Sequence, residues 1–343
     1  MVSFSHDLAA RMIRLRNNTI SDQNMDQWRF PSSVSWYQDD KHLLDTLDHV
    51  LNSPDAYDNA ASLYWDNQSR DLLSLLFCFR ALGPSHVMLP SNTKNYWKNY
   101  EIAASWRKGP GEREVPPFEF SLYQAQFMDT PIELECWLGN AVFSFLVEQY
   151  FLNRRGITVK PSPGDYVIDA GGCFGDTALA FSVAIGESGR VFSFEPLPRL
   201  KEIFVSNLRR NVDLARRIEL FEYAVWDVSR HTLNFSDFGA GSRQDRNGEI
   251  QVATITIDDF VVARRLPRVD FIKMDIEGAE REALRGAADT IRRFKPRLAI
   301  SAYHRLDDLL VLPAMIKEIE PSYELILDHY TIHSEESVIY ATV

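Results

Sequence analysis

The sequence predicts an α/β fold in which helices cover both faces of a mostly parallel, Rossmann-like sheet. From about residue 164, short runs of β-forming residues alternate with helical segments. Strands of this kind, buried on both faces and separated by helices, indicate a doubly wound sheet. A glycine-rich turn after the first run supports the same fold. The strand candidates are DYVIDA, RVFSFEP, IELFEYAV, VDFIKMDI and PRLAISAY.

The end of the chain departs from a plain dinucleotide-binding sheet. Two strand-like runs, YELILDHY (323–330) and ESVIYATV (336–343), are joined by a short turn. A hairpin here makes the last strand antiparallel to the others. The sequence therefore predicts a sheet with a reversed last strand. The two histidines of this hairpin, His329 and His333, are expected at the surface.

Residues 1–155 are expected to form a mainly helical region. Apolar residues recur at helical spacing in 39–52 and 69–83, and a further helix is expected over 140–156. The Gly- and Pro-rich segment 107–120 is typical of a loop. This half is rich in aromatic residues, which suits a cap or substrate region. We therefore expect a cap over 1–155 and a cofactor-binding domain over 156–343.

The composition is that of a soluble globular protein, with 45% hydrophobic and 25% charged residues among 343. A net charge of −11 argues against a nucleic-acid partner, because a phosphate backbone is repelled. The wide spacing of Cys78, Cys136 and Cys173 fits neither a disulfide framework nor a zinc site. No secretory signal or membrane-length apolar run is visible. These features predict a cytoplasmic protein. They leave open a homo-oligomer.

The glycine turn VIDAGGCFGDTALAF (167–181) is the strongest local signal. Its glycines allow a tight turn and close approach of a ligand, but a structural corner would use them as well. The G-x-G-x-x-G pattern of dinucleotide enzymes is absent. Acids on both sides of the glycines, Asp169 and Asp176, would repel a pyrophosphate and attract a cationic amino-acid group.

An acid at the end of the second strand narrows the choice of cofactor. Glu195 follows Gly175 by 20 residues, the place where a carboxylate accepts hydrogen bonds from a ribose diol. A nucleoside with an amino-acid tail and no pyrophosphate is S-adenosylmethionine. The two signals together therefore favour this cofactor over a nicotinamide dinucleotide.

From roughly Tyr123 to the C-terminus the chain resembles the FkbM-type methyltransferases. The resemblance implies a class I methyltransferase fold, which is a seven-stranded sheet with a reversed last strand. It also implies O-methylation, commonly of sugar or natural-product hydroxyls. Residues 1–120 carry no motif of this family. The segments that carry the likeness are VIDAGGCFGDTAL (167–179), FSFEPLP (192–198), AVWD (224–227), TIDDF (256–260), FIKMDIEGAEREALRGA (271–287), KPRLAISAYH (295–304) and YELILDHYTIHSEESVIYA (323–341).

The same resemblance implies a set of cofactor-binding residues. The glycine turn would line the methionine end of S-adenosylmethionine, and Glu195 would hold its ribose. Residues that follow the second strand, and residues at the end of the third strand, would lie on either side of the adenine. Many methyltransferases have an acid just before the third-strand alanine, where this chain has Tyr223. The implied residues are Asp169, Gly171, Gly172, Phe174, Gly175, Asp176, Thr177, Glu195, Pro196, Leu197, Ala224, Val225 and Ser242.

The candidate catalytic residues follow the fourth and fifth predicted strands. Asp275 and Glu277 come from MDIEG, and His304 ends SAYH. Asp275 and His304 would form a base and its orienting partner, or all three would hold a divalent cation such as Mg²⁺ that acidifies the hydroxyl. The alternative is structural, with Asp275 as a helix N-cap and Glu277 as a first-turn acid.

These observations predict an S-adenosylmethionine-dependent O-methyltransferase. The resemblance implies a small-molecule or glycan acceptor, with the methyl group going to a hydroxyl of a sugar, glycan or glycosylated secondary metabolite. In-line methyl transfer would gain most of its rate from the positioning of two bound reactants. Two other classes stay open: a non-catalytic module that keeps the cofactor fold for interaction, and a nicotinamide-dependent oxidoreductase.

Overall fold

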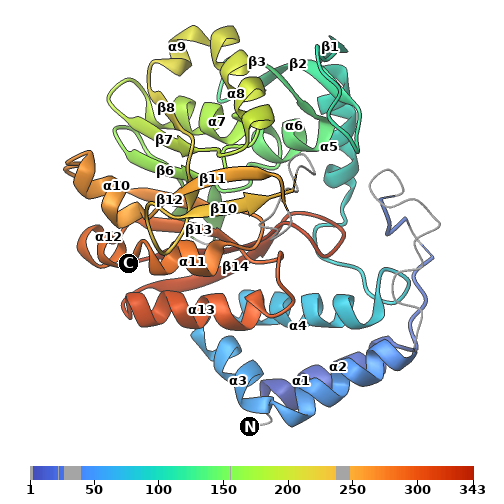
Figure 1. Cartoon of the computed structure of the whole chain (residues 1–343). Coiled ribbons are helices and arrows are strands. Elements are labelled where there is room, and N and C mark those ends of the chain that lie inside the picture. The colour runs from blue at the N-terminus through green and yellow to red at the C-terminus, as the bar shows by residue number, and fades with distance from the viewer. Residues whose placement is uncertain (1–2, 22, 27–39, 155, 237–247) are drawn as a thin grey trace. The chain divides into compact units, whose positions relative to one another are not determined.

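A computed structural model describes residues 3–21, 23–26, 40–154, 156–236 and 248–343 (Figure 1). The chain divides into two compact units. The first comprises Met1–Tyr96, Ala302–Glu318 and Ser322–Ile339, and the second comprises Trp97–Ser301, Ile319–Pro321 and Tyr340–Val343. Among the described residues, no helix is long and apolar enough to cross a membrane. A separate substrate role for residues 1–155 stays a prediction.

The first unit is built on amphipathic helices. Helix α4 begins where Asp66 accepts a 2.6 Å hydrogen bond from the amide of Ser69, and it ends at Gly83, whose φ of 72° only glycine adopts readily. The helices predicted over 39–52 and 69–83 are confirmed as α2 and α4. The helices of this unit are α1 (Phe4–Leu15), α2 (Asp40–Asn52), α3 (Pro54–Leu63), α4 (Asn67–Leu82) and most of α13 (Asp308–Ile319).

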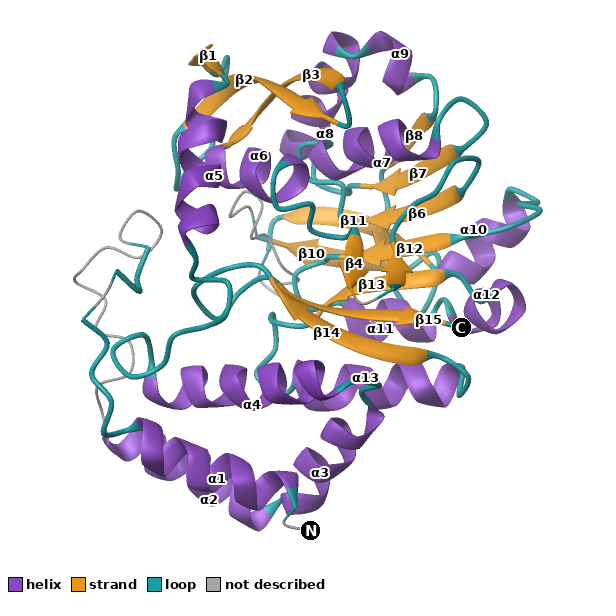
Figure 2. Cartoon of the chain, turned by 180° about the vertical axis from the view of Figure 1, so that it is seen from behind, coloured by secondary structure: helices purple, strands orange, loops and turns teal. Residues whose placement is uncertain are grey.

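A mixed seven-stranded sheet in the order β14-β15-β13-β12-β6-β7-β8 confirms the predicted fold class (Figure 2). Strands β13, β12, β6, β7 and β8 belong to the second unit and pair in parallel. The predicted terminal hairpin corresponds to β14 and β15. The seven strands are β6 (Tyr166–Ala170), β7 (Arg190–Phe194), β8 (Ile218–Phe221), β12 (Phe271–Met274), β13 (Arg297–Ser301), β14 (Glu324–His329) and β15 (Ser337–Thr342).

The strand order reverses its direction between β6 and β12. From β6 the chain moves through β7 to β8, whereas β12 leads to β13 on the opposite side. Right-handed crossovers then place the first helices on one face of the sheet and the later ones on the other. Ligands of such sheets bind beyond the carboxyl ends of the strands at this switch point. The connecting helices are α7 (Asp176–Ile185), α8 (Pro198–Arg210), α9 (Val212–Ala215), α10 (Ile257–Ala263), α11 (Glu280–Arg285) and α12 (Ala288–Phe294).

Additional small sheets lie outside the central one, and the sequence pattern did not predict the first of them. Strands β1, β2 and β3 form an antiparallel sheet within residues that we expected to be helical or loop. The burial of β2 alternates from Ser121 to Phe127, but two of its buried positions are Ser121 and Ala125, so the apolar alternation in the sequence is weak. These elements are α5 (Lys94–Ser105), β1 (Arg107–Pro110), β2 (Phe120–Phe127), β3 (Thr130–Trp137), β4 (Leu152–Arg154), β5 (Ile157–Val159), β9 (Ala224–Val225), β10 (Thr232–Phe235) and β11 (Ile250–Ile255).

The helix expected over 140–156 is much shorter in the structure. Helix α6 covers Leu138–Phe145 and is followed by Glu148 and Tyr150, both with positive φ (56° and 75°). Left-handed backbone is uncommon for residues other than glycine and ends a helix. Hydrogen bonds to residues distant in sequence hold Tyr150 in this conformation, so a helical pattern could not reveal the early end.

The expectation that His329 and His333 lie at the surface is wrong. They are only 5% and 7% exposed. Burial and the charge of Arg80 lower the pKa of His329 to about 3. Hydrogen bonds within the turn favour the charged form, but their effect on the pKa is smaller. Its Nδ1 lies 2.9 Å from the Ser337 hydroxyl. His329 is thus a neutral core residue of the first unit. The polar residues around it in the hairpin sequence are typical of a surface turn, which is why we expected it to be exposed.

Candidate functional site

The glycine turn connects β6 to α7 at the switch point of the sheet. Gly171 has a φ of 88°, and a Cβ placed on it would lie 1.9 Å from the carbonyl oxygen of Asp275. The ends of β6 and β12 therefore approach each other so closely that only glycine fits. A Cβ on Gly172 would lie 2.4 Å from the Ser193 hydroxyl oxygen and 2.7 Å from the ring of Phe204. Much of the glycine requirement is therefore steric.

The amides of this turn are not arranged as a phosphate cradle. Gly171 and Gly172 both donate their N–H groups to the carbonyl of Phe194 at the end of β7, at 3.1 and 2.9 Å. Gly175 donates to the carbonyl of Gly172. Because a pyrophosphate site needs amides that point at the ligand, this turn does not suit a dinucleotide.

Asp169 is fully buried and forms an ion pair within the sheet. Its Oδ1 lies 3.3 Å from the ammonium of Lys273 on β12, and its Oδ2 accepts a 2.7 Å hydrogen bond from Ser193. Thr177 adds a longer hydrogen bond from its hydroxyl. Lys273 also donates a 2.5 Å hydrogen bond to the carbonyl of Gly171. The carboxylate and the ammonium thus fix the turn to the neighbouring strand.

Lys273 is the cation of this otherwise acidic region and is 2% exposed. Burial opposes its charge, but the carboxylates of Asp169, Asp275 and Asp176 outweigh burial and raise its pKa. The sequence reasoning missed this residue. A lysine inside the apolar run FIKM was the available signal, because a buried lysine requires a paired carboxylate.

Glu195 directly follows β7 and has no ion-pair partner within hydrogen-bonding distance among the described residues. Its two carboxylate oxygens accept hydrogen bonds from the amides of Cys173 (3.0 Å) and Leu197 (2.9 Å). Burial raises the pKa of Glu195 to about 7 in spite of these amides and of Lys273. The side chain is therefore held at the turn with an incompletely compensated charge.

The other predicted residues of the turn have structural contacts. Asp176, the first residue of α7, accepts a 2.6 Å hydrogen bond from Ser144, and burial raises its pKa. The ring of Phe174 packs edge-on against Phe120 and Trp137, with ring centroids 5.2 and 5.3 Å away. Burial also raises the pKa of the Cys173 thiol well above its usual value, so the thiol is neutral at physiological pH and is no nucleophile.

The residues expected around an adenine lie at the ends of β7 and near β8. Leu197 is 5% exposed and precedes α8, and Pro196 is half-buried. Ala224 and Val225 are buried in β9 and pair with β11. Tyr223, where other methyltransferases have an acid, is 39% exposed. Ser242 lies outside the described residues.

Asp275 follows β12 and does not cap the next helix. Helix α11 begins only at Glu280, with Ala279 as its N-cap, and Glu277 lies in the intervening turn with a φ of 55°. The structural alternative for Asp275 and Glu277 is therefore wrong. Instead, Asp275 Oδ2 accepts a 2.8 Å hydrogen bond from the hydroxyl of Tyr150.

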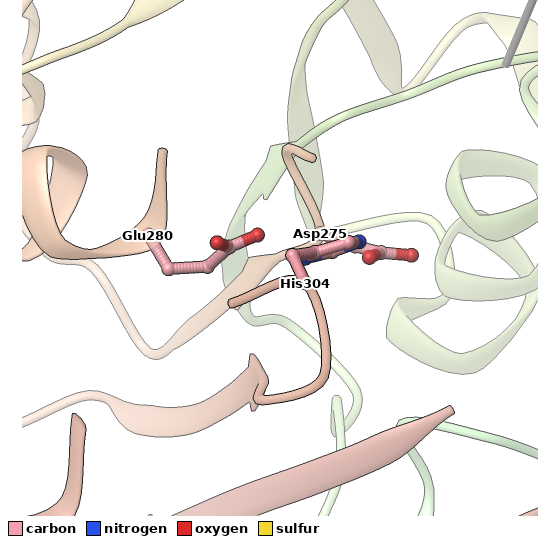
Figure 3. A group of neighbouring side chains, drawn as sticks. All are labelled: Asp275, Glu280 and His304. Atoms are coloured by element: carbon pink, nitrogen blue, oxygen red, sulfur yellow. The ribbon is translucent and has the colours of Figure 1, made fainter. Parts of the chain in front are cut away.

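Glu280 is the acid that lies beside Asp275 (Figure 3). It is 1% exposed, and its Oε1 accepts a 2.9 Å hydrogen bond from the amide of Ile276. One carboxylate oxygen of each residue lies within 4.8 Å of the other. Our sequence reasoning chose Glu277, because the turn that places Glu280 beside Asp275 is invisible in the motif. His304, also drawn in Figure 3, follows β13 by three residues and belongs to the first unit.

The strand order, the glycine turn after β6 and the acid after β7 together define a class I methyltransferase fold. Residues 169–322 match the methyltransferase FkbM domain. The chain therefore contains a methyltransferase FkbM domain, and the protein is an S-adenosylmethionine-dependent methyltransferase. The resemblance predicted from the sequence is thus confirmed over these residues.

Two similar proteins illustrate the relationship. The 2-O-methyltransferase NoeI of Sinorhizobium fredii (strain NBRC 101917 / NGR234) is 27% identical over 199 residues, which are 51% of this chain and 79% of that protein. The crystal structure of methyltransferase FkbM from Methylobacillus flagellatus KT matches 86% of this chain with a TM-score of 0.55 and 23% identity. The match spans 60% of that chain, and at this identity it supports the fold alone.

Proposed function

We propose that this protein transfers a methyl group from S-adenosylmethionine to a hydroxyl of a sugar, glycan or glycosylated secondary metabolite. The observation that carries the proposal is the excess of buried carboxylates at the switch point. Asp169, Asp176 and Glu195 are each at most 4% exposed, and Lys273 is the buried cation nearest to them among the described residues. Such a site favours a cationic ligand. The similarity to a 2-O-methyltransferase supports oxygen as the acceptor atom.

The residues present fit S-adenosylmethionine. Glu195 offers a carboxylate with raised pKa to a ribose diol, and the turn at Gly171 and Gly175 brings the backbone close to the methionine end. Leu197 and Val225 offer apolar surfaces for the adenine. When bound, the cofactor supplies an electrophilic methyl group on a sulfonium. Excess negative charge in the site complements that sulfonium, and the engaged glycine amides disfavour NAD.

We further propose that Asp275 and His304 remove the proton of the acceptor hydroxyl. Asp275 is the first residue after β12, and His304 follows the neighbouring parallel strand β13. Carboxyl ends of adjacent parallel strands meet at one edge of the sheet, where His304 would accept the proton while Asp275 orients the imidazole.

A divalent cation is the second candidate for the same step. The paired oxygens of Asp275 and Glu280 suit Mg²⁺, and His304 or the acceptor hydroxyl would complete the coordination. Glu277 was the acid expected for this role, and the proximity of Glu280 to Asp275 favours Glu280 instead. Turnover that falls with chelator and returns with Mg²⁺ would select this arrangement.

The experiment has two stages. Calorimetric titration with S-adenosylmethionine and, separately, NAD should show binding of the first alone. A panel of monosaccharides and their methyl glycosides is then screened by release of S-adenosylhomocysteine, and the product should be a methyl ether. Absence of cofactor binding, or methylation of nitrogen or carbon, would refute the proposal.

His304→Ala tests the base. Turnover should fall about 10²- to 10⁴-fold, because general-base assistance contributes that much, while the Kd of S-adenosylmethionine stays within about threefold. His86→Ala is the matched control, since the hydrogen bond of the His86 ring among the described residues is to the carbonyl of Asn18, at 2.7 Å. Unchanged turnover of His304→Ala would remove His304 from the mechanism.

A further inference from the structure

Tyr150 joins the ends of two neighbouring strands through its hydroxyl group. The hydroxyl donates a 2.8 Å hydrogen bond to Asp275 Oδ2 after β12 and lies 3.5 Å from the Ser301 hydroxyl at the end of β13. It accepts a 3.2 Å hydrogen bond from the side-chain amide of Gln149. Because Gln149 supplies a donor, the hydroxyl proton is directed to the Asp275 carboxylate.

The backbone of Tyr150 is strained, and the surrounding structure maintains the strain. Its φ of 75° is left-handed, a backbone conformation that residues other than glycine rarely adopt. The amide of Tyr150 donates a 3.1 Å hydrogen bond to the hydroxyl of Tyr340, and the side chain is 3% exposed. Strain of this kind persists where other contacts determine the conformation, and it is concentrated at functional sites.

The ring of Tyr150 faces the other half of the site. The ammonium of Lys273 lies 5.4 Å from the ring centroid, within the range of a cation–π contact. The same ammonium binds Asp169 and the carbonyl of Gly171. One side chain therefore touches both the lysine that fixes the glycine turn and the carboxylate that follows β12.

We infer that Tyr150 is a positioning residue with two separable tasks: its hydroxyl orients Asp275 for the acceptor, and its ring holds Lys273 for the cofactor turn. The inference rests on the proposed function of Asp275. A hydrogen bond to one carboxylate oxygen fixes the rotation of the carboxyl group, which is the usual role of a partner behind a reacting residue. The two tasks use different parts of the side chain, so two substitutions can separate them.

Tyr150→Phe removes the hydroxyl and keeps the ring. With the acceptor found in the screen above, kcat should fall about 10- to 100-fold, as is typical when an orienting partner is lost. The Kd of S-adenosylmethionine, measured by calorimetry, should stay within about threefold, because the ring still faces Lys273.

Tyr150→Leu removes the ring as well. We expect the same loss of kcat and, in addition, cofactor binding weakened about 3- to 10-fold through the lost contact with Lys273. Calorimetry measures this second effect without an acceptor. Tyr64→Phe is the control, because Tyr64 is 1% exposed and its hydroxyl has no hydrogen-bond partner among the described residues. Its kcat and Kd should equal those of the wild type.

Two outcomes would overturn the inference. If Tyr150→Phe weakens cofactor binding as much as Tyr150→Leu, the hydroxyl supports the fold and not Asp275. If Tyr150→Phe turns over like the wild type, the hydroxyl orients nothing that the reaction needs. Both outcomes differ from failure of the proposed function, in which the wild-type protein itself binds no S-adenosylmethionine or methylates no hydroxyl.

Discussion

The ends of the adjacent strands β6 and β7 hold two buried carboxylates in opposite electrostatic situations. Asp169 of β6 is paired with Lys273 at 3.3 Å and accepts hydrogen bonds from Ser193 and Thr177. Among the described residues, Glu195 after β7 accepts hydrogen bonds only from two backbone amides, and burial raises its pKa to about 7. The two acids lie at the ends of neighbouring strands: Asp169 precedes the glycine turn, and Glu195 accepts a hydrogen bond from an amide of that turn.

The contrast separates a framework residue from a ligand-binding residue. A carboxylate with a buried cation is neutralised within the protein and fixes the strands that carry both charges. When a buried carboxylate has no cation beside it, its charge is not compensated within the protein, and a ligand can compensate it. A raised pKa of this kind is typical of functional sites. We therefore propose that Asp169 stabilises the turn and that Glu195 binds the cofactor.

The largest effect should come from the turn on which both acids depend. In Gly171→Ala, the new Cβ meets the Asp275 carbonyl oxygen at 1.9 Å in a left-handed backbone, so we expect a loss of roughly 4 kcal/mol or more in the free energy of unfolding. Gly156→Ala is the control, because Gly156 has a φ of 85° but no atom within 4 Å of the new Cβ. Urea denaturation should show only about 1–2 kcal/mol for the control. Equal losses would show that the close approach of β6 and β12 is unimportant.

Removing the cation should test the framework role of Asp169. Lys273→Met keeps the apolar stem and leaves the carboxylate buried without a partner, which costs about 3–5 kcal/mol of unfolding free energy. The double variant Asp169→Asn, Lys273→Met should recover part of that loss, because it buries no unpaired charge. A single variant as stable as the wild type would contradict the role of the ion pair.

Glu195→Gln should affect binding more than folding. We expect the Kd of S-adenosylmethionine to rise about 10- to 100-fold by calorimetry, the effect of losing a charged hydrogen-bond acceptor. Asp213→Asn, an exposed acid of α9, is the control and should bind as the wild type does. Unaltered affinity of Glu195→Gln would place the ribose elsewhere.

The pH dependence of folding has a definite sign at Glu195. Because its folded pKa of about 7 lies above the unfolded value, its protonation favours the folded state, and this contribution is lost as the pH rises through 7. Relative to the wild type, Glu195→Gln should therefore gain roughly 1–3 kcal/mol in unfolding free energy between pH 5 and pH 8. Thermal denaturation of both proteins over this range measures the difference. A constant difference would show that the pKa is not raised.

The smallest effect concerns ligand affinity and pH. If the cofactor binds the ionised form of Glu195, affinity should increase by up to about tenfold from pH 6 to pH 8. Glu195→Gln should lack this increase, and it also corrects for titration of the ligand itself. Calorimetry at three pH values suffices. A parallel increase in both proteins would assign the effect to another group.

The central fold and one half of the site were predictable because they depend on local patterns. Buried runs alternating with helices identified the sheet, and Asp169, Glu195 and Asp275 stand at strand ends that the runs themselves mark. Other residues depend on contacts between distant segments. The role of Lys273 depends on its ion pair with Asp169, and the role of Tyr150 depends on its hydrogen bond to Asp275.

The sequence by itself determined the class of fold, the glycine turn and the resemblance to the family. Strand periodicity, the position of glycines and the spacing of motifs are local properties that can be recognised in the sequence. The tertiary structure decided which acid pairs with a buried lysine and which does not, and that Glu280 rather than Glu277 lies beside Asp275. It also decided that α6 ends early, at Phe145, before the left-handed residues Glu148 and Tyr150. The physical reason is that burial, ion pairing and carboxylate orientation depend on neighbours from other strands, whose identity no local pattern contains.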